Sequence, residues 1–158
     1  MKDKLEKLEM MVDDDLDYLV MLEKREDKLN DEYINLFLYN SIRDYSCFFK
    51  KYKYAMFGDI IFWLDESEFL EHQNDLIEYN VPKQDEYICI GEIEPYPLII
   101  NKSNGIVSYL INEVEYDYKM VNLGMFNDFI DSYVIGSKYM ELGSIEEWND
   151  FLISNKFI

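Results

Sequence analysis

Residues 86–121 constrain the fold of this chain more than any other stretch, because three short strand-like runs are separated there by turn residues. The runs 87–90, 96–100 and 106–111 are rich in β-branched and aromatic residues, which suit a pleated, half-buried surface. Asn104 and Gly105 separate the last two runs, and both tolerate the positive φ angles of a tight reversal. We therefore predict a small antiparallel meander at the middle of the only sheet.

Helices are predicted on both sides of this meander. Apolar residues at helical spacing indicate helices in residues 2–12, from about Asp15 onward, and after Asn122, which is expected to cap the last of them. Three capping boxes, each a polar residue followed three positions later by an acid, predict further helix starts at Ser41, Asp65 and Ser144. These starts pair with Asp44, Glu68 and Glu147.

Two further strands complete the predicted elements. Residues 60–64 form an apolar run typical of a buried strand, and residues 118–121 fit a fourth strand after the meander. Residues 33–39 are apolar and fit a helix or a strand. The order of helices, strand, helix, meander and helices predicts the α+β class, with an antiparallel sheet flanked by several helices. At 158 residues we expect one domain, with residues 1–40 as a helical N-terminal extension of a core at 41–158.

The charge of the chain limits its partners. Fifteen Lys and Arg against 33 Asp and Glu give a formal charge of −18. This acidity disfavours nucleic acid and anionic membranes, which are polyanions, and suits a basic protein partner or simply solubility. No apolar signal segment is visible, and the longest central apolar run is far too short to span a bilayer, so we expect a cytoplasmic protein.

Residue patterns for catalysis are largely missing. His72 is the one histidine and lies in an acidic segment, where a surface or packing role is expected. Cys47 and Cys89 lie in apolar settings, which predicts buried, reduced thiols, and their spacing from His72 does not fit a zinc site. The glycine spacing does not fit a phosphate-binding loop, so we expect no cofactor, no bound metal and no enzymatic activity.

One hydrolase alternative stays open. Asp117 and Lys119 have the D-x-K form of some metal-dependent nucleases, in which a carboxylate holds the metal and the lysine orients water. Glu92 or Glu94 would supply the further acid that such a site needs. The strong negative charge of the chain would repel a nucleic-acid substrate, which weighs against this alternative.

Acidic residues concentrate in residues 59–94, which carry eleven acids and one base, Lys83. Acids interleaved with tyrosines suit a surface that captures a basic protein, because the field speeds encounter and the aromatic rings supply anchors. The plainer alternative is that these acids only solvate one helix and its loops. The predicted partner-binding residues are Asp65, Glu66, Glu68, Glu71, Asp75, Glu78, Asp85, Glu86, Glu92, Glu94, Tyr79 and Tyr96.

Three segments within residues 41–133 follow one another: the helical SIRDYSCFFKKY, the strands and turn of YICIGEIEPYPLIINKSNGIVSYL, and the phenylalanine-rich residues 122–133. They resemble the early helix, the central strands and turn, and the following helix of the SUKH superfamily. That superfamily includes the fungal Smi–Knr cell-wall regulators and many bacterial immunity proteins. The chain departs from the family in its paired glycines, which are reduced to Gly91, and residues 1–40 have no counterpart.

The resemblance implies a SUKH-like core and a non-enzymatic binding protein. Many bacterial members neutralise a cognate toxin, often a nuclease, by direct binding. The expectation is therefore an immunity protein that occludes the active cleft of a basic toxin with the acids of residues 66–94. The alternative is an intracellular regulatory or scaffold module without a toxin partner, as in the fungal branch.

Overall fold

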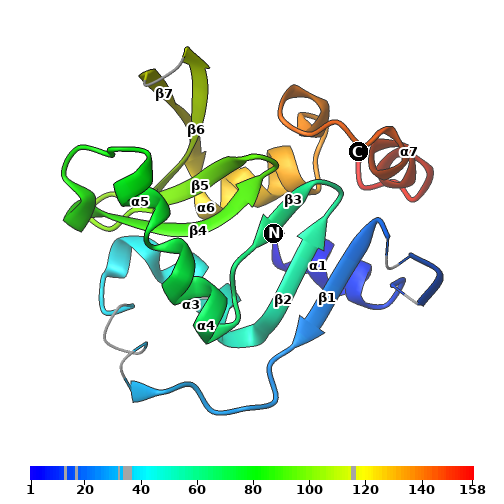
Figure 1. Cartoon of the computed structure of the whole chain (residues 1–158). Helices are drawn as coiled ribbons and strands as arrows, with labels where there is room; N and C mark the ends of the chain where they lie inside the picture. Colours follow the sequence, from blue (N-terminus) through cyan, green and yellow to red (C-terminus); the bar gives the residue numbers. More distant parts are fainter. Residues whose placement is uncertain (13, 17, 32, 34–36, 115–116) are drawn as a thin grey trace.

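The computed structural model describes residues 1–12, 14–16, 18–31, 33, 37–114 and 117–158. These residues form an α+β fold around a seven-stranded antiparallel sheet, whose strands follow one another in chain order from β1 to β7 (Figure 1). The predicted fold class is confirmed. The strands are β1 (Val20–Lys24), β2 (Tyr52–Phe57), β3 (Ile60–Phe62), β4 (Tyr87–Ile93), β5 (Tyr96–Asn101), β6 (Ile106–Val114) and β7 (Asp117–Met125).

The predicted meander is confirmed as β4, β5 and β6, and the fourth strand as part of β7. The reversal between β5 and β6 is fixed by Asn101, whose side-chain oxygen accepts hydrogen bonds from the backbone N–H groups of Ser103 and Asn104 at 2.8 and 3.2 Å. Gly105 follows with φ +73°, a left-handed conformation that glycine adopts without steric cost. The turn thus sets the register in which Ile99 lies opposite Ser108.

One face of the sheet is covered by helices and carries the larger core (Figure 1). Aromatic side chains fill it: Phe49 of α3 (Arg43–Lys51), Phe62 of β3, Phe129 of α6 (Phe126–Phe129) and Trp148 of α7 (Glu146–Ser154) are completely buried. The helices of the described residues are α1 (Lys2–Glu9), α3 (Arg43–Lys51), α4 (Glu66–His72), α5 (Asp75–Glu78), α6 (Phe126–Phe129) and α7 (Glu146–Ser154), joined by 3-10 turns at Asp14–Leu16, Asn40–Ile42, Gln84–Glu86 and Tyr139–Glu141 and a π-helical turn at Ile130–Val134. No helix in the described part of the chain is both long and apolar enough to cross a membrane.

The second face of the sheet is only partly covered. A small cluster packs α5 and the loop after it onto the middle strands, through the buried side chains of Leu76, Val81, Cys89, Ile99 and Leu110. Over β1, β2 and β3, no helix of the described residues lies on this face (Figure 1). The candidate site described below lies on this uncovered part of the sheet.

The helix predicted from about Asp15 is wrong. Val20–Lys24 form the edge strand β1, which pairs antiparallel with β2. Leu16, Leu19 and Val20 follow helical spacing by chance, and pairing with a distant strand overrides that weak local signal. β2 was itself absent from the prediction. The apolar run at 33–39 includes residues 34–36, which lie outside the described part of the chain.

Two of the three predicted capping boxes do not form. Ser41 donates its hydroxyl to the carbonyl of Lys102, and Ser144 donates to Asp59 Oδ2 at 2.9 Å, so both side chains bridge to distant loops. The helices α3 and α7 then begin two residues later, after Ile42 and Ile145. Short polar side chains bond to whichever partner the fold brings close, which makes the local pattern ambiguous.

The cap at Asp65 is confirmed, whereas the cap at Asn122 is wrong. Asp65 accepts a hydrogen bond from the backbone N–H of Ser67 at 3.1 Å, which satisfies one free donor at the start of α4. Asn122 lies inside β7, where its side chain accepts from Ser108 Oγ at 2.8 Å. The helix predicted after it begins at Phe126.

The first residues of the chain belong to the same sheet and core. Leu5 and Leu8 of α1 are buried, and Lys4 Nζ donates to the carbonyl of Ile135 at 2.8 Å. After β1, Arg25 donates to the carbonyls of Phe49 (3.3 Å), Tyr52 (3.2 Å) and Leu64, so a single guanidinium joins α3, β2 and the segment after β3.

Candidate functional site

A row of side chains crosses the uncovered part of the sheet. Met21 of β1 lies opposite Met56 of β2, Met56 lies opposite Ile61 of β3, and Ile61 lies opposite Glu92 of β4. Directly opposed residues of an antiparallel sheet project from the same face, so the four side chains form one stripe that runs from the sheet edge to a carboxylate. All four are partly exposed.

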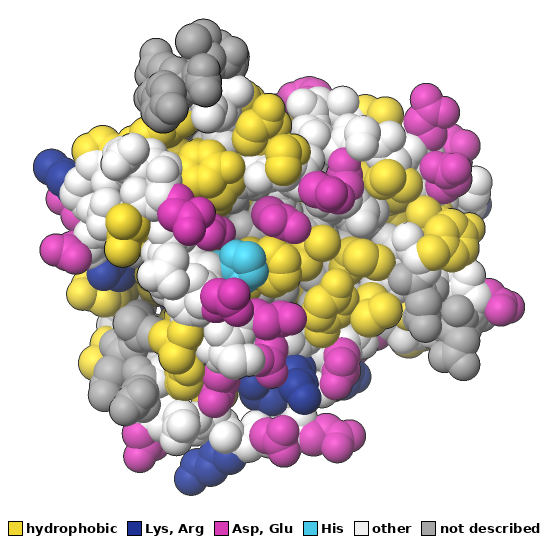
Figure 2. Space-filling view, in the orientation of Figure 1, with side chains coloured by type: hydrophobic (Ala, Val, Ile, Leu, Met, Phe, Trp, Pro, Cys, Tyr) yellow, Lys and Arg dark blue, Asp and Glu magenta, His cyan; other side chains and the backbone are white. Residues whose placement is uncertain are grey.

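Two aromatic residues widen this stripe. Tyr54 precedes Met56 by two positions and Trp63 follows Ile61 by two, so strand alternation places both on the same side of the sheet. We call the surface made by Met21, Tyr54, Met56, Ile61, Trp63 and Glu92 the open face. Figure 2 shows hydrophobic side chains gathered over these strands, with acidic side chains along their border.

The helices α4 and α5 form one wall of the open face. The ring of His72 stacks on Trp63, with centroids 4.0 Å apart and planes 4° apart, and its Nδ1 lies 3.0 Å from Asp75 Oδ2. Gln73 anchors the same segment, because its side chain donates to the carbonyl of Cys89 and accepts from the N–H of Cys89, both at 2.9 Å. These contacts hold Asp75 beside β4, on the side of Glu92.

Several charged side chains at this end of the stripe act on the pKa of Glu92. Burial raises the pKa of Glu92, nearby His72 lowers it, and the carboxylates of Glu94 and Asp75 raise it further. Burial also raises the pKa of Tyr54, and the charges of Glu68 and Glu92 raise it further. A half-buried carboxylate among other acids attracts a cation, because a lysine or arginine would relieve both the desolvation and the repulsion.

Part of the predicted binding set gathers here. The pKa of Tyr79 is raised by burial first and then by Asp75, Tyr96, Glu78 and Glu92, so these side chains share one electrostatic environment. We call these side chains, together with Glu68 and Glu94, the acidic border of the open face. Its members all act on the raised pKa of Tyr54, Tyr79 or Glu92 or carry that shift themselves, and they are Glu68, Asp75, Glu78, Tyr79, Glu92, Glu94 and Tyr96.

The other predicted residues make different contacts. Asp65 is engaged as the cap of α4, and Glu66 accepts from the backbone N–H of Asn30 at 3.1 Å. Glu86 pairs with Lys83 at 3.4 Å, in the 3-10 turn that also carries Asp85. Glu71 is exposed on α4. The acids of residues 59–94 thus belong to several elements, which include α4, α5, the 3-10 turn and β4.

Sequence reasoning missed the apolar half of the site. Met21, Tyr54, Met56 and Ile61 come from three strands, of which only the third was predicted. The alternation in Tyr52–Phe57 is the signal that could have shown it, since every second residue from Tyr54 leaves the buried side.

The hydrolase alternative finds little support in the sheet order. β5 and β6 lie between β4 and β7, so Glu92 is three strand spacings, about 14 Å, from the strand that carries Lys119, and Glu94 lies in the turn between β4 and β5. The side chain of Asp117 lies outside the described part of the structure. Among the described residues, no group of three His, Cys, Asp or Glu side chains could hold a metal ion.

The two cysteines differ, which corrects one prediction. Cys89 is buried and burial raises the pKa of its thiol, as expected, but Cys47 is exposed on α3. The apolar neighbours of Cys47 in the sequence, Phe48 and Phe49, point into the core, so its own position falls on the outer side of the helix.

A thiol-reactive dye is therefore expected to distinguish the two cysteines. The folded protein should release one equivalent of chromophore rapidly, from Cys47, because a thiolate must form and be reached before it reacts. The second equivalent should appear only after denaturation. The Cys47→Ser variant is the control, and rapid reaction of this variant in its folded form would contradict the burial of Cys89.

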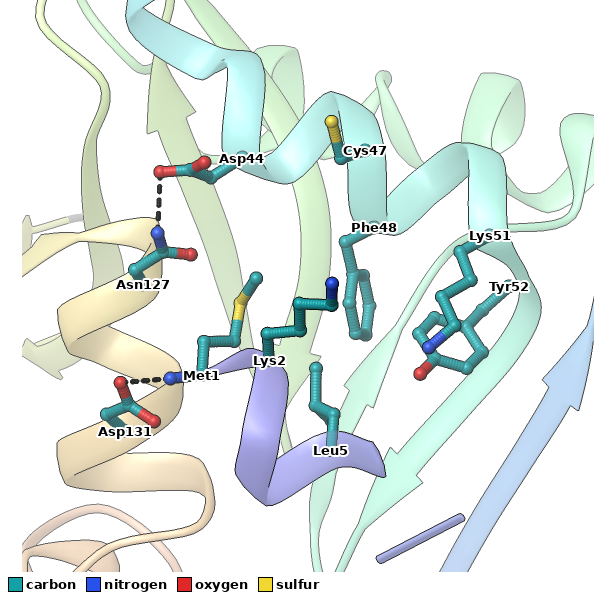
Figure 3. A pocket seen from close by; sticks show the side chains of 10 residues that line it. All are labelled: Met1, Lys2, Leu5, Asp44, Cys47, Phe48, Lys51, Tyr52, Asn127 and Asp131. Atoms are coloured by element: carbon teal, nitrogen blue, oxygen red, sulfur yellow. Dashed lines mark hydrogen bonds and ion pairs between the residues drawn. The ribbon is translucent and has the colours of Figure 1, made fainter. Parts of the chain in front are cut away.

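Hollows also lie beside other elements of the described part of the chain. One of about 420 Å³ lies between α1, α3 and α6, where Asn127 donates to Asp44 at 2.7 Å and the amino group of Met1 pairs with Asp131 (Figure 3). Its polar side chains thus tie α1 to the core. Another, of about 300 Å³, lies beside α4 and α5 and is lined in part by the exposed Leu70.

No family model, curated protein or solved structure matches this chain. The candidate site is therefore defined by its geometry.

Proposed function

We propose that this chain is a cytoplasmic, non-enzymatic binding protein that captures a basic protein partner through the open face and its acidic border. The observation that supports this most is the position of Glu92, a half-buried carboxylate at the end of an apolar stripe and within the field of Asp75 and Glu94. Exposed apolar surface bordered by charge is typical of protein interaction sites. The charge of −18 would steer a positively charged partner toward the chain.

The resemblance of residues 41–133 to the SUKH superfamily supports a specific biological role for this binding. We propose that the partner is a cognate toxin with a basic active cleft, and that the protein acts as its immunity protein. The carboxylates at the border would occupy the positions of the nucleic-acid phosphates in the toxin's basic cleft. The apolar stripe would pack against the toxin and fix its orientation. Occlusion of this kind needs no cofactor from either protein.

Binding should be measured between the purified protein and the product of the adjacent gene, over a range of salt concentrations. The variant Asp75→Asn/Glu92→Gln/Glu94→Gln is expected to weaken binding by about tenfold or more at low salt and to flatten the salt dependence, because charges at an interface act mainly on association. The matched control is Asp85→Asn/Glu86→Gln/Glu141→Gln, which removes the same charge elsewhere and should change affinity less than about twofold.

Equal losses in the two variants would show that only net charge matters, which contradicts a defined site. Several unrelated partners, or a partner whose activity survives saturating amounts of this protein, would favour a regulatory or scaffold module in place of an immunity protein.

A further inference from the structure

The open face has the dimensions of a helix-binding surface. Strands of a sheet lie about 4.8 Å apart, so the three steps from Met21 to Glu92 span about 14 Å. An α-helix rises about 1.5 Å per residue, so about nine or ten of its residues cover that length. A helix that crosses the strands would place apolar residues about three or four positions apart over Met21, Met56 and Ile61, and its next residue on that side would meet Glu92.

The fold already uses this mode of coverage next to the open face. α5 packs on the same side of the sheet over the middle strands, through Leu76 and its neighbours. Sheet faces are normally covered by helices or by a second sheet, and here the helical layer of the described residues ends before β3. A helix supplied by the partner would continue this layer. Methionine suits such a surface, because its flexible thioether adapts to different side chains.

The negative charge around Glu92 determines which kind of partner helix can bind to the open face. Glu92 closes one end of the stripe, with Asp75 and Glu94 beside it, so the helix must carry a cation there. A second copy of this chain would bring acid against acid at a net charge of −18 each, which disfavours self-association through this face. Arginine is the better match, because its planar guanidinium can pair with a carboxylate through two parallel hydrogen bonds.

We infer that the open face binds an amphipathic helix of the partner, whose apolar side chains cover Met21, Met56 and Ile61 and whose arginine or lysine pairs with Glu92. This inference rests on the proposed function, since it assumes a basic protein partner, but it adds the element that is recognised. It also predicts a pattern in the partner: three apolar residues at helical spacing, followed about one turn later by a cation on the same side.

A designed helical peptide of about fifteen residues tests the inference directly. It carries leucines at the spacing derived above and an arginine one turn beyond them, and the comparison peptide has the same composition with the arginine on the opposite side. The protein is labelled with ¹³C at the methyl groups of methionine and isoleucine. Met10 and Met140, which are 86% and 45% exposed and lie elsewhere, serve as internal controls.

The expected result is a shift of the methyl signals of Met21, Met56 and Ile61, with Met10 and Met140 unchanged and with affinity at least about fivefold higher for the peptide whose arginine faces Glu92. The Glu92→Gln variant should remove this preference, and Met56→Gln should weaken both peptides. Shifts that spread over all methionines, the absence of shifts at millimolar peptide, or no dependence on the arginine position would overturn the inference. Self-association of the unliganded protein that perturbs the same three methyl groups would assign the face to a second copy.

Failure of this inference can be told apart from failure of the proposed function. If the full-length partner binds with the acid dependence described above, but Met56→Gln/Ile61→Asn binds it as tightly as the original protein, the helix is wrong and the acidic capture stands. Thermal unfolding of each variant shows that its fold is retained.

Discussion

Replacement of Trp148 by alanine is expected to lower the free energy of unfolding by about 3–5 kcal/mol, the range for truncation of a fully buried tryptophan. The indole packs against Phe57 of β2 and stacks on Phe151, with centroids 5.3 Å apart. Its Nε1 donates to the carbonyl of Val134 at 3.0 Å. Trp148 thus joins α7, the sheet and the π-helical turn, and alanine would leave a cavity where these three meet.

Urea denaturation followed by circular dichroism measures this loss, and Trp148→Phe is the matched control. Phenylalanine keeps most of the ring contacts but leaves the Val134 carbonyl without its donor, so we expect a smaller cost of about 1–3 kcal/mol. A loss below about 1 kcal/mol for alanine would contradict the packing of α7 against the sheet.

The strands of residues 87–111 could be predicted from sequence because several local signals agree there. β-Branched residues, the Asn101 turn and the glycine at φ +73° all specify the same reversal, and each acts within a few residues. β1 could not be predicted in this way. Its partner β2 lies about thirty residues away, and nothing in Val20–Lys24 itself outweighs the accidental helical spacing before it.

The candidate site shows the same division between local and distant information. The count of acids in residues 59–94 predicts a negative surface, and seven of the twelve predicted residues are linked through the raised pKa of Tyr54, Tyr79 or Glu92. The apolar stripe could not be counted in this way, because Met21, Met56 and Ile61 are brought into line only by the registers of three strand pairs. A sequence pattern specifies which face a residue takes within its strand, but the register between strands depends on the whole sheet.

The register that aligns this stripe depends on Gly91. A Cβ atom built on Gly91 would overlap the backbone oxygen of Ile61 and would lie 3.1 Å from Phe62 Cα, so β3 and β4 approach too closely there for any other residue. We expect Gly91→Ala to cost about 3 kcal/mol or more, because the obstacle is backbone and cannot rotate away as a side chain would. Chemical denaturation measures the cost, and the ¹³C-methyl signal of Ile61 reports the local displacement.

The double variant Gly91→Ala/Ile61→Ala separates backbone overlap from side-chain crowding. Removal of the Ile61 side chain leaves its carbonyl oxygen in place, so the double variant should be no more stable than Gly91→Ala alone. Recovery of stability would mean that side chains, and not the backbones of β3 and β4, set the spacing of the two strands. Because Ile61 lies opposite Glu92 in this same pairing, a displaced β3 should also weaken binding of the arginine peptide. Stability and recognition would then depend on the same close approach of β3 and β4. Because Gly91 has no Cβ, the two strands pair in the register that places Ile61 opposite the carboxylate of Glu92.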